Sequence, residues 1–347
     1  MFDLTAVFVN HRTADLCREA VKSLRECASE EGVSLFVVVV DCASGPDEAG
    51  PLRDISADRQ VLLKDNRGYS GGLNAGLSAA ESNLVLLCNA DVLFLPGALR
   101  PLIEEAARAG VGAAAPVQFA DRRARIRLPT GFGSGLVRDF LQSRGASPRL
   151  WERERFARAA RRQWRLWERG GDAAHLTGSI LMTRLDVLDR VGRFDERFPF
   201  EYEETEWQDR LRAAQLRLRV VAQSRACHFP GSSFSRSEGA EERRRTSRAL
   251  YRRRRFGPAV SRALEWAERR GRPPVPPTWD RPSFSGLGPG LAIAASLNPS
   301  MQPFSAASSD SAVSLPDLFE ALGPSLYLRV FETETGEPDA TFRASRP

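Results

Sequence analysis

The chain has 347 residues, of which 42% are hydrophobic and 27% charged, an ordinary composition for a globular protein with a substantial core. Its formal net charge of +6 is carried almost entirely by arginine, since Lys22 and Lys64 are the only lysines. The five cysteines are scattered, odd in number and without a CxxC pair, which predicts reduced thiols and excludes a disulfide framework. No apolar stretch approaches the roughly 18 to 20 residues that span a bilayer, and no signal peptide is recognisable. We therefore expect a cytoplasmic protein, either soluble or bound to a membrane surface.

The first 120 residues alternate between predicted strands and predicted helices. The strands are expected at residues 4–9, 35–40, 60–64, 83–88 and 112–117, and the helices at residues 15–26, 71–80 and 96–108. This order is typical of an α/β fold with a mostly parallel, Rossmann-like sheet flanked by helices, in which ligands bind beyond the carboxyl ends of the strands. Asp41 and Asp91 each stand at such a strand end, so both are expected at the same edge of the sheet.

The periodicity weakens over residues 121–172, where one surface helix is expected at 150–168, and we interpret this stretch as an insertion bordering the acceptor site. Further strands are predicted at residues 176–183 and 218–221, and further helices at residues 186–191 and 203–214. The expected domain organisation is one domain at 1–272, with a core at 5–234 and a helical tail at 240–270, then a proline-rich linker at 273–278. Residues 279–347 are expected to form a small β-rich or partly disordered C-terminal region of unknown function.

Residues 66–76 contain four glycines and form the most informative motif. Closely spaced glycines let a backbone approach a ligand without interference from Cβ atoms. Before a helix, they also expose N–H groups that suit a phosphate. A tight turn explains such a loop equally well, so the motif alone leaves both interpretations open.

Acidic residues and one histidine mark further candidate positions. Asp91 follows an apolar strand and is suited to hold Mg²⁺ or Mn²⁺ through oxygen, although it could also cap the next turn. Residues 201–206 place four glutamates at the start of a helix, where the helix dipole favours them or where one serves as a general base. His228 is expected in a loop after a strand, and it becomes a metal ligand if it converges on Asp91.

Arginine clusters at residues 243–245 and 252–255 lie on a predicted helix. A solvated helix face is one interpretation, and docking to an anionic membrane surface is the other. No nucleic-acid-reading module accompanies the clusters, so nucleic acid is not an expected partner.

In their order along the chain, these motifs resemble those of the family 2 glycosyltransferases, especially the bacterial rhamnosyltransferase-like branch. The resemblance is carried by residues 7–11, 38–44, 66–74, 88–92, 177–182, 191–198, 203–204 and 228. It implies a GT-A fold, a nucleotide-diphosphate sugar as donor, and Asp41 beside the pyrimidine base. The nucleotide-sugar contacts that it implies are Asn10, Asp41, Asn66, Gly68, Gly71, Gly72, Asn74, Asn89, Asp91 and Gly178.

The resemblance also implies a divalent cation, Mg²⁺ or Mn²⁺, held by Asp91 and His228. Asn89 replaces the first acidic residue of the family's DxD-type motif. The family's general base is the aspartate of a Glu-Asp pair, and Glu204 takes that place here, with Glu203 as the alternative. Arg210 is expected to orient the helix or the phosphate.

The predicted function is inverting transfer of a sugar, such as rhamnose or another hexose, to a hydroxyl of a glycan or lipid-linked acceptor. The expected location is the cytoplasm, where the protein is either soluble or peripherally bound at the inner face of the cell membrane. One alternative is a catalytically silent nucleotide-sugar-binding or scaffold protein of the same fold. Another is a nucleotidyltransferase, which would carry a basic glycine-rich loop near the first strand that residues 10–15 lack.

Overall fold

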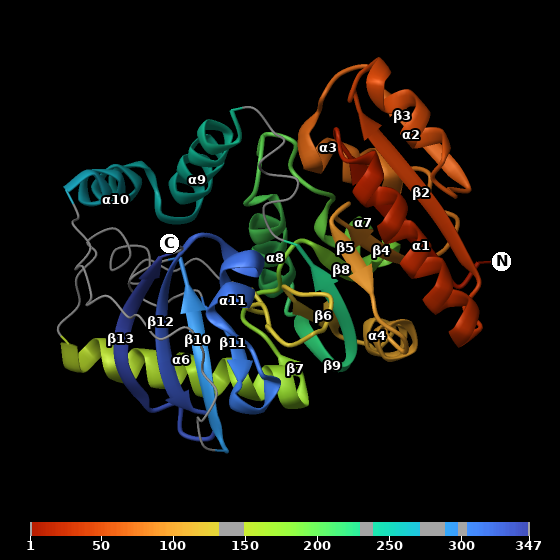
Figure 1. The fold of residues 1–347 in the computed structure, drawn as a ribbon. Helices are drawn as coiled ribbons and strands as arrows, with labels where there is room; N and C mark the ends of the chain where they lie inside the picture. The colour runs from red at the N-terminus through yellow and green to blue at the C-terminus, as the bar shows by residue number, and fades with distance from the viewer. Residues whose placement is uncertain (1, 132–148, 230–238, 271–288, 298–303, 346–347) are drawn as a thin grey trace. The chain divides into compact units, whose positions relative to one another are not determined.

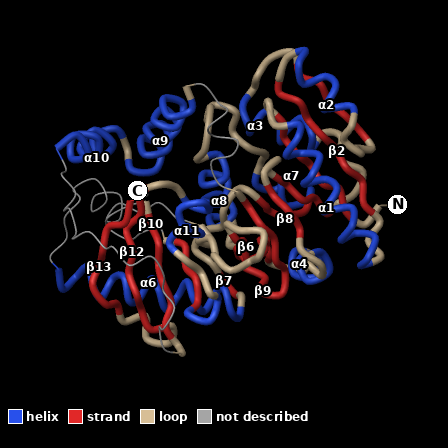
Figure 2. The backbone as a smooth tube through the Cα atoms, in the orientation of Figure 1, coloured by secondary structure: helices blue, strands red, loops and turns tan. Residues whose placement is uncertain are grey.

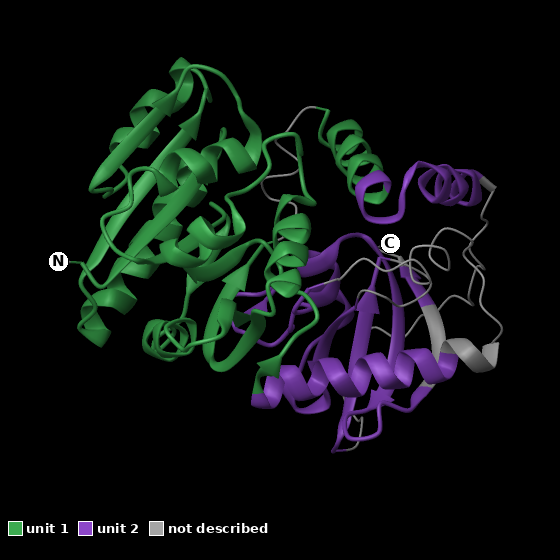
Figure 3. Cartoon of the chain, turned by 180° about the vertical axis from the view of Figure 1, so that it is seen from behind, with its two compact units in different colours: residues 1–117, 170–252 green, residues 118–169, 253–347 purple. Residues whose placement is uncertain are grey.

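The computed structural model describes residues 2–131, 149–229, 239–270, 289–297 and 304–345, and the chain forms two compact units (Figures 1 and 3). Unit 1 comprises residues 1–117 and 170–252, and unit 2 comprises residues 118–169 and 253–347. Each unit therefore contains two separate stretches of sequence. None of the helices in the described ranges has the length and apolar composition needed to cross a membrane. All five cysteines are buried, and none of them forms a disulfide.

Unit 1 alternates between strand and helix along its backbone (Figure 2). Its strands are β1 (Leu4–Asn10), β2 (Leu35–Cys42), β3 (Arg59–Leu63), β4 (Leu84–Cys88), β5 (Val92–Phe94), β6 (Val111–Phe119, which runs into unit 2), β7 (Gly171–Asp172), β8 (Ile180–Arg184) and β9 (Arg217–His228). Its helices are α1 (Ala14–Glu31), α2 (Ala49–Arg53), α3 (Gly68–Leu77), α4 (Leu99–Ala106), α7 (Leu185–Val191), α8 (Glu203–Ala213) and α9 (Ala240–Phe256, which also crosses into unit 2), with a 3₁₀ turn at Pro46–Glu48.

The strands form one sheet in the order β3-β2-β1-β4-β8-β6-β9-β5, with β7 beside β9. Strands β1 to β4 pair in parallel, whereas β8 is antiparallel to β4, and β5 and β7 are antiparallel to β9. Every residue of β1 and β2 is buried, which explains their continuous apolar runs. The register pairs Asn10 with Asp41 and Phe8 with Cys88, so the carboxyl ends of β1, β2 and β4 meet at one edge. The strand order reverses between β1 and β4, where α/β sheets bind their ligands.

The glycines of α3 bring this helix close to β1. A Cβ added at Gly72 would lie 2.5 Å from Val9 Cγ1, and one added at Gly76 would lie 2.2 Å from Val7 Cγ1. No real Cβ tolerates such distances, so larger residues here would push α3 away from the sheet. These two glycines therefore serve helix–sheet packing.

Unit 2 is built around a four-stranded antiparallel sheet, and two of its helices pack on this sheet. Its strands, in the order β11-β10-β12-β13, are β10 (Leu291–Ser296), β11 (Ser305–Ser308), β12 (Ser325–Glu332) and β13 (Pro338–Ser345). Its helices are α6 (Arg149–Arg169), α10 (Pro258–Arg270) and α11 (Leu315–Leu322), with a 3₁₀ turn at Ser309–Ser311. Leu326 and Leu328 of β12 join the apolar cluster of α11, whereas the ring of Phe331 packs against Phe156 and Trp164 of α6. Because strand side chains alternate, α6 and α11 cover opposite faces of the sheet.

The sequence places residues 121–172 beside an acceptor site and separates them from residues 279–347. In the structure, residues 118–169 instead belong to the same compact unit as the C-terminal strands. Arg127 forms a β-bridge to Ala306, and the Trp167 ring lies 6.1 Å from that of Phe304. These contacts join parts of the chain too far apart for a local pattern to reveal. The expected linker at 273–278 lies outside the described residues.

Candidate active site

Asp41 lies at the end of β2 in a buried cluster of hydrogen bonds. Asn10 Nδ2, on the neighbouring strand end, donates to Asp41 Oδ1 at 2.8 Å and to Ser44 Oγ at 3.2 Å. The Ser44 N–H donates to Asp41 Oδ2 at 3.1 Å, and its hydroxyl donates to Asp41 Oδ1. Asn10 Oδ1 in turn accepts from the Thr13 N–H and hydroxyl. The side-chain amide of Asn10 is thus used to orient the Asp41 carboxylate.

Asn66 and His11 lie near this cluster, around the carbonyl group of Cys42. His11 Nδ1 is 2.9 Å from the Cys42 carbonyl oxygen, and its Nε2 is 3.3 Å from Asn66 Nδ2. The Asn66 side chain also accepts from the Gly68 N–H at 2.9 Å, which folds the loop before α3. Gly68 has φ +69°, and an added Cβ would lie 3.1 Å from the Pro199 carbonyl oxygen. No local sequence pattern places the His11 ring beside Asn66, so His11 is not among the predicted site residues.

Asp91 and His228 converge, as the sequence analysis required for a shared metal site. Their side chains approach to 3.5 Å between Oδ1 and Nε2, with Asp91 2% exposed. Pairing of Val92 in β5 with His228 in β9 fixes this approach, and the Phe229 N–H donates to the Asp91 carbonyl oxygen. His228 is the last residue of β9, so the predicted loop location was wrong.

A divalent cation suits these two side chains. A carboxylate oxygen and an imidazole nitrogen are both ligands of Mn²⁺, and donor atoms 3.5 Å apart can share one ion. Among the described residues, no group of three or more His, Cys, Asp and Glu side chains is placed to hold a metal. In nucleotide sites, Mg²⁺ commonly binds only one or two protein side chains, and phosphate oxygens and water complete its coordination shell. Two protein ligands are therefore enough for such a site.

Tyr69, at the start of α3, is surrounded by acidic groups. Burial raises the pKa of its hydroxyl well above the ordinary value, and the nearby Cys88, Glu203, Asp91 and Glu204 raise this pKa further. The Tyr69 hydroxyl donates to the Gly178 carbonyl oxygen at 3.4 Å. Tyr69 therefore stays protonated and places a neutral hydrogen-bond donor among the carboxylates.

The two glutamates at the start of α8 have different surroundings. Glu203 is 4% exposed, and burial together with the charge of Glu204 raises its pKa well above the ordinary value. Burial also raises the pKa of Glu204, but Glu204 Oε1 accepts a hydrogen bond from the Thr205 hydroxyl at 2.9 Å, which favours the charged form. Glu203 Oε2 has no hydrogen-bond partner within the described ranges. Burial thus raises the pKa of both glutamates, and at Glu204 the hydrogen bond from Thr205 opposes this rise.

The backbone next to the two glutamates has an unusual conformation before α8 and approaches Glu204 closely at Gly178. Glu201 and Tyr202 have φ +59° and +70°, a conformation that non-glycine residues adopt at a cost of about 1–3 kcal/mol each. A Cβ at Gly178 would lie 2.9 Å from Glu204 Cγ, so a larger residue would displace this glutamate. The neighbouring Asn89 donates its N–H to the Ser179 carbonyl oxygen at 2.8 Å, which joins the end of β4 to the same loop.

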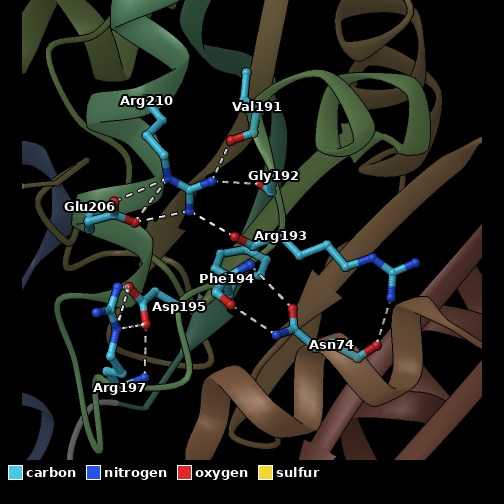
Figure 4. A network of polar contacts seen from close by, with 9 residues as sticks. All are labelled: Asn74, Val191, Gly192, Arg193, Phe194, Asp195, Arg197, Glu206 and Arg210. Carbon is cyan, nitrogen blue, oxygen red and sulfur yellow. Dashed lines mark hydrogen bonds and ion pairs between the residues drawn. The ribbon is translucent and has the colours of Figure 1, made fainter.

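Gly71 and Asn74 lie on the side of α3 that meets the segment before α8. A Cβ at Gly71 would lie 2.4 Å from Arg67 Cβ. Asn74 Nδ2 donates to the carbonyl oxygen of Phe194 at 2.9 Å (Figure 4). It also donates to Glu196 Oε1 at 2.9 Å. Arg210 was expected to orient either the helix or the phosphate. In the structure its guanidinium donates to backbone carbonyl oxygens of the same segment and so attaches this segment to α8.

These elements define a class of protein. An α/β domain presents a buried aspartate, an Asp–His pair and a glutamate pair around the switch point of a Rossmann-like sheet. The chain belongs to glycosyltransferase family 2: a family model described as "Glycosyltransferase like family 2" matches residues 3–250. The expected family and the α/β fold class, GT-A, are confirmed. The expected C-terminal appendage is part of a larger unit that also contains residues 118–169.

Comparison with individual proteins gives more distant similarities. The succinoglycan biosynthesis protein ExoO of Rhizobium meliloti (strain 1021) is 34% identical over 110 residues, and this match spans 31% of each chain. Among solved structures, the mannosyltransferase PcManGT from Pyrobaculum calidifontis, in complex with GDP-Man and Mn²⁺, is 18% identical with a TM-score of 0.48. That match covers 77% of this chain and 69% of the other. TarS of S. aureus (residues 1–349) is 13% identical with a TM-score of 0.43, covering 76% of this chain and 70% of the other.

Proposed function

We propose that this glycosyltransferase transfers a sugar, such as rhamnose or another hexose, from a nucleotide-diphosphate sugar to an acceptor hydroxyl with inversion at the anomeric carbon. The observation that carries the proposal is the convergence of the Asp91–His228 pair, 3.5 Å apart, with Glu203, Glu204 and Tyr69. A carboxylate that abstracts the acceptor proton and a site for the leaving diphosphate are the two parts that a single displacement requires.

On the donor side, Asp41 and its hydrogen-bonded partners form a rigid acceptor for N–H groups of the nucleotide base. Asn66 and Gly68 border this site, while Asp91 and His228 would hold a divalent cation, Mg²⁺ or Mn²⁺. When bound, such a cation neutralises charge on the diphosphate as it departs. Asn89, two residues before Asp91, and Gly178, beside Glu204, border the space for the sugar.

On the acceptor side, Glu204 is the better candidate for the base. Its charged form accepts a hydrogen bond from Thr205, whereas burial keeps Glu203 neutral. Glu204 therefore removes the acceptor proton as the hydroxyl attacks the anomeric carbon. Fixed geometry and preorganised charge supply most of the acceleration.

The acceptor that we propose is a glycan or a lipid-linked intermediate of the kind used by the rhamnosyltransferase-like branch. The similarity to a protein named for succinoglycan biosynthesis supports a glycan acceptor. Because the match spans less than a third of that relative, its substrates are not carried over as such.

The decisive experiment is release of nucleoside diphosphate from a panel of UDP-, GDP- and dTDP-sugars with Mn²⁺ or Mg²⁺ and a mixture of glycan acceptors. We expect turnover with one nucleotide class, its loss on chelation, and at least a tenfold loss in Asp91→Asn and His228→Gln. Nucleotide binding without turnover for any donor would instead favour the alternative of a catalytically silent sugar-binding or scaffold protein. Product anomeric configuration, read by NMR, tests inversion.

A peripheral membrane contact through α9, at the cytoplasmic face of the membrane, is a separate part of the proposal. The helix packs through Ser247 and Tyr251 on residues 200–209, and Arg252 is 4% exposed, so this arginine is part of the packed face. Arg245, Arg253 and Arg255 are exposed. Replacing these three by glutamine should weaken cosedimentation with anionic phosphatidylserine vesicles and leave binding to neutral vesicles unchanged. Unaltered binding to anionic vesicles would count against the contact.

A further inference from the structure

Residues 191–197 form a segment between α7 and the loop that leads into α8, and we call it the linking segment (Figure 4). On one side, the guanidinium of Arg210 donates to three consecutive carbonyl oxygens, those of residues 191, 192 and 193, at 2.5–2.8 Å. Glu206, one helical turn earlier in α8, holds this guanidinium through an ion pair of 3.0 Å. The planar fork of Arg210 thus attaches the linking segment to the helix that carries the candidate base.

On the other side, α3 holds the linking segment through Asn74. Its Oδ1 accepts from the Phe194 N–H at 3.2 Å, and its Nδ2 donates to the Phe194 carbonyl oxygen at 2.9 Å. The side-chain amide of Asn74 therefore bonds to both the N–H and the carbonyl group of Phe194, as the backbone of a neighbouring β-strand would. Arg193 reaches back to α3, where it donates to the Asn74 carbonyl oxygen and to Ser78 Oγ.

Glu196 extends the attachment to the start of α3. Its Oε1 accepts from Asn74 Nδ2, and its Oε2 forms a 2.5 Å ion pair with Arg67. The hydrogen bond from Asn74 and the contact with Arg67 lower the pKa of Glu196, so the carboxylate is charged at neutral pH. Arg67 directly precedes Gly68, where the loop beside the proposed nucleotide site enters α3.

The middle of the linking segment is anchored in the core. The Phe194 ring packs 5.1 Å from that of Trp207 in α8, and Trp207 is fully buried. An aromatic contact combined with hydrogen bonds from two helices leaves the segment little freedom to shift. Movement of α3 would therefore be transmitted to α8 through the backbone of the linking segment, which is hydrogen-bonded to both helices.

We propose that Arg210 and Asn74 are positioning residues, which through the linking segment hold Glu204 in a fixed place relative to the donor loop at the start of α3. This inference rests on the proposed function. It assigns Asn74 to the linking segment, whereas the sequence analysis assigned it to the nucleotide sugar. Misplacement of a catalytic group by about 1 Å can cost roughly 100-fold in rate, so removal of either attachment should act mainly on turnover.

The test compares Arg210→Lys and Asn74→Ala with Arg197→Lys as the matched control. Arg197 lies on the same segment, but its ion pair is with Asp195, two residues away, and its side chain is 71% exposed. Lysine keeps the charge of Arg210 but not the fork that spans three carbonyls. Both test variants should lose roughly 100-fold in kcat, with an unchanged dissociation constant for the nucleoside diphosphate, while the control keeps its kcat.

The double variant Arg210→Lys/Asn74→Ala should lose much less than the product of the two single losses, because both residues act on one segment. Multiplicative losses, an unchanged kcat in either single variant, or weaker nucleotide binding in Asn74→Ala would overturn the inference. If one variant does not fold, the other still decides the outcome through its kcat and nucleotide binding.

Hydrogen exchange separates this inference from the proposed function. If the unmodified protein turns over no donor, the proposed function fails, yet the Phe194 and Glu206 amides still report on the attachment. Both amides should exchange faster in Arg210→Lys and Asn74→Ala than in Arg197→Lys, at a temperature where all variants are folded. Equal exchange in the three variants would overturn the inference.

Discussion

The neighbouring glutamates Glu203 and Glu204 carry the same carboxyl group, but they differ in their hydrogen bonds and in the charges beside them. Glu203 is enclosed and feels the charge of Glu204, whereas Glu204 has the Thr205 hydroxyl as a hydrogen-bond donor. A neutral glutamate next to a charged one can share the polar space without two like charges in contact. The base and its neighbour are thus distinguished by their environment and not by residue type.

Glu204→Gln tests the assignment of the base. An isosteric amide cannot accept the acceptor proton, so kcat should fall by about 10²- to 10⁴-fold while nucleoside diphosphate binding is retained. Because the pKa of Glu204 is raised above 4.5, kcat/KM of the unmodified protein should fall as the pH drops through that raised pKa. Steady-state kinetics across pH measure both effects. A larger loss in Glu203→Gln than in Glu204→Gln would move the base to Glu203.

Glu203→Gln should make the protein more stable near neutral pH. The folded state holds the Glu203 proton more tightly than the unfolded chain, so its contribution to stability is present below pH 4.5 and is lost as the pH rises through the folded-state pKa. Glutamine removes this loss, since it stays neutral at every pH. Thermal unfolding should show a higher midpoint for the variant at pH 8 and equal midpoints near pH 4. Equal midpoints at both pH values would mean that Glu203 is charged without penalty in the folded protein.

At the scale of elements, the glycines of α3 set the distance between this helix and the sheet. Gly76→Ala would place a Cβ 2.2 Å from Val7 Cγ1, so the helix must shift, at a cost of about 1–3 kcal/mol in the free energy of unfolding. Gly50→Ala in α2 is the matched control, because its added Cβ meets nothing within 4 Å. Alanine should stabilise that helix by about 0.5–1 kcal/mol. Urea unfolding of both variants gives the comparison, and equal effects would exclude the packing role.

In unit 1, the strands in which every residue is buried were predicted from the sequence. The apolar runs of β1 and β2 identified these strands to within two residues at each end. The predicted strand at 218–221 missed most of β9, because Gln223, Ser224 and Arg225 interrupt its apolar pattern. Within this polar stretch, the Ser224 hydroxyl donates to the Ala98 carbonyl oxygen, and the Arg225 carbonyl oxygen accepts from the Leu95 N–H. The same extension carries His228 into the sheet.

In the candidate site, too, positions set by local sequence patterns were predicted, whereas contacts between residues far apart in the sequence were not. Strand ends placed Asp41 and Asp91 at one edge of the sheet, because parallel strands carry their carboxyl ends to the same side. The pairing of Asn74 with Phe194 joins residues 120 positions apart and depends on the path of the whole chain. A glycine-rich motif predicts close approach of a backbone, but only the structure shows that Gly72 approaches β1.

At the scale of the molecule, unit 2 depends on contacts between its two stretches of sequence. Arg125 binds Asp121 in its own turn and Asp317 at the first turn of α11, at 3.0 and 2.9 Å. Burial alone would raise the pKa of Asp317, but hydrogen bonds from Ser314 and the contact with Arg125 outweigh it and lower the pKa to about 2. The ion pair thus attaches residues 121–125 to a helix nearly two hundred positions away in sequence.

Asp317→Asn should therefore destabilise unit 2 in a pH-dependent way. The contribution of Asp317 is present above its unfolded pKa near 4 and is lost as the pH falls towards 2. At pH 7 the variant should lose about 1–2 kcal/mol, since the side chain also caps α11. Calorimetry at pH 7 and pH 2.5 measures the difference, which should be clearly smaller at the lower pH. A loss that is the same at both values would assign the effect to packing and not to charge.

The discontinuity of unit 2 also has a consequence for synthesis. Helix α6 leaves the ribosome long before the strands that cover Phe156 and Trp164, because residues 170–303 must be made first. At 5–20 residues per second, this interval is on the order of ten seconds. During that time the nascent chain exposes an aromatic helix face while its first sheet is already able to fold. We therefore expect the nascent chain to bind chaperones during synthesis, and a chain terminated after residue 250 to aggregate.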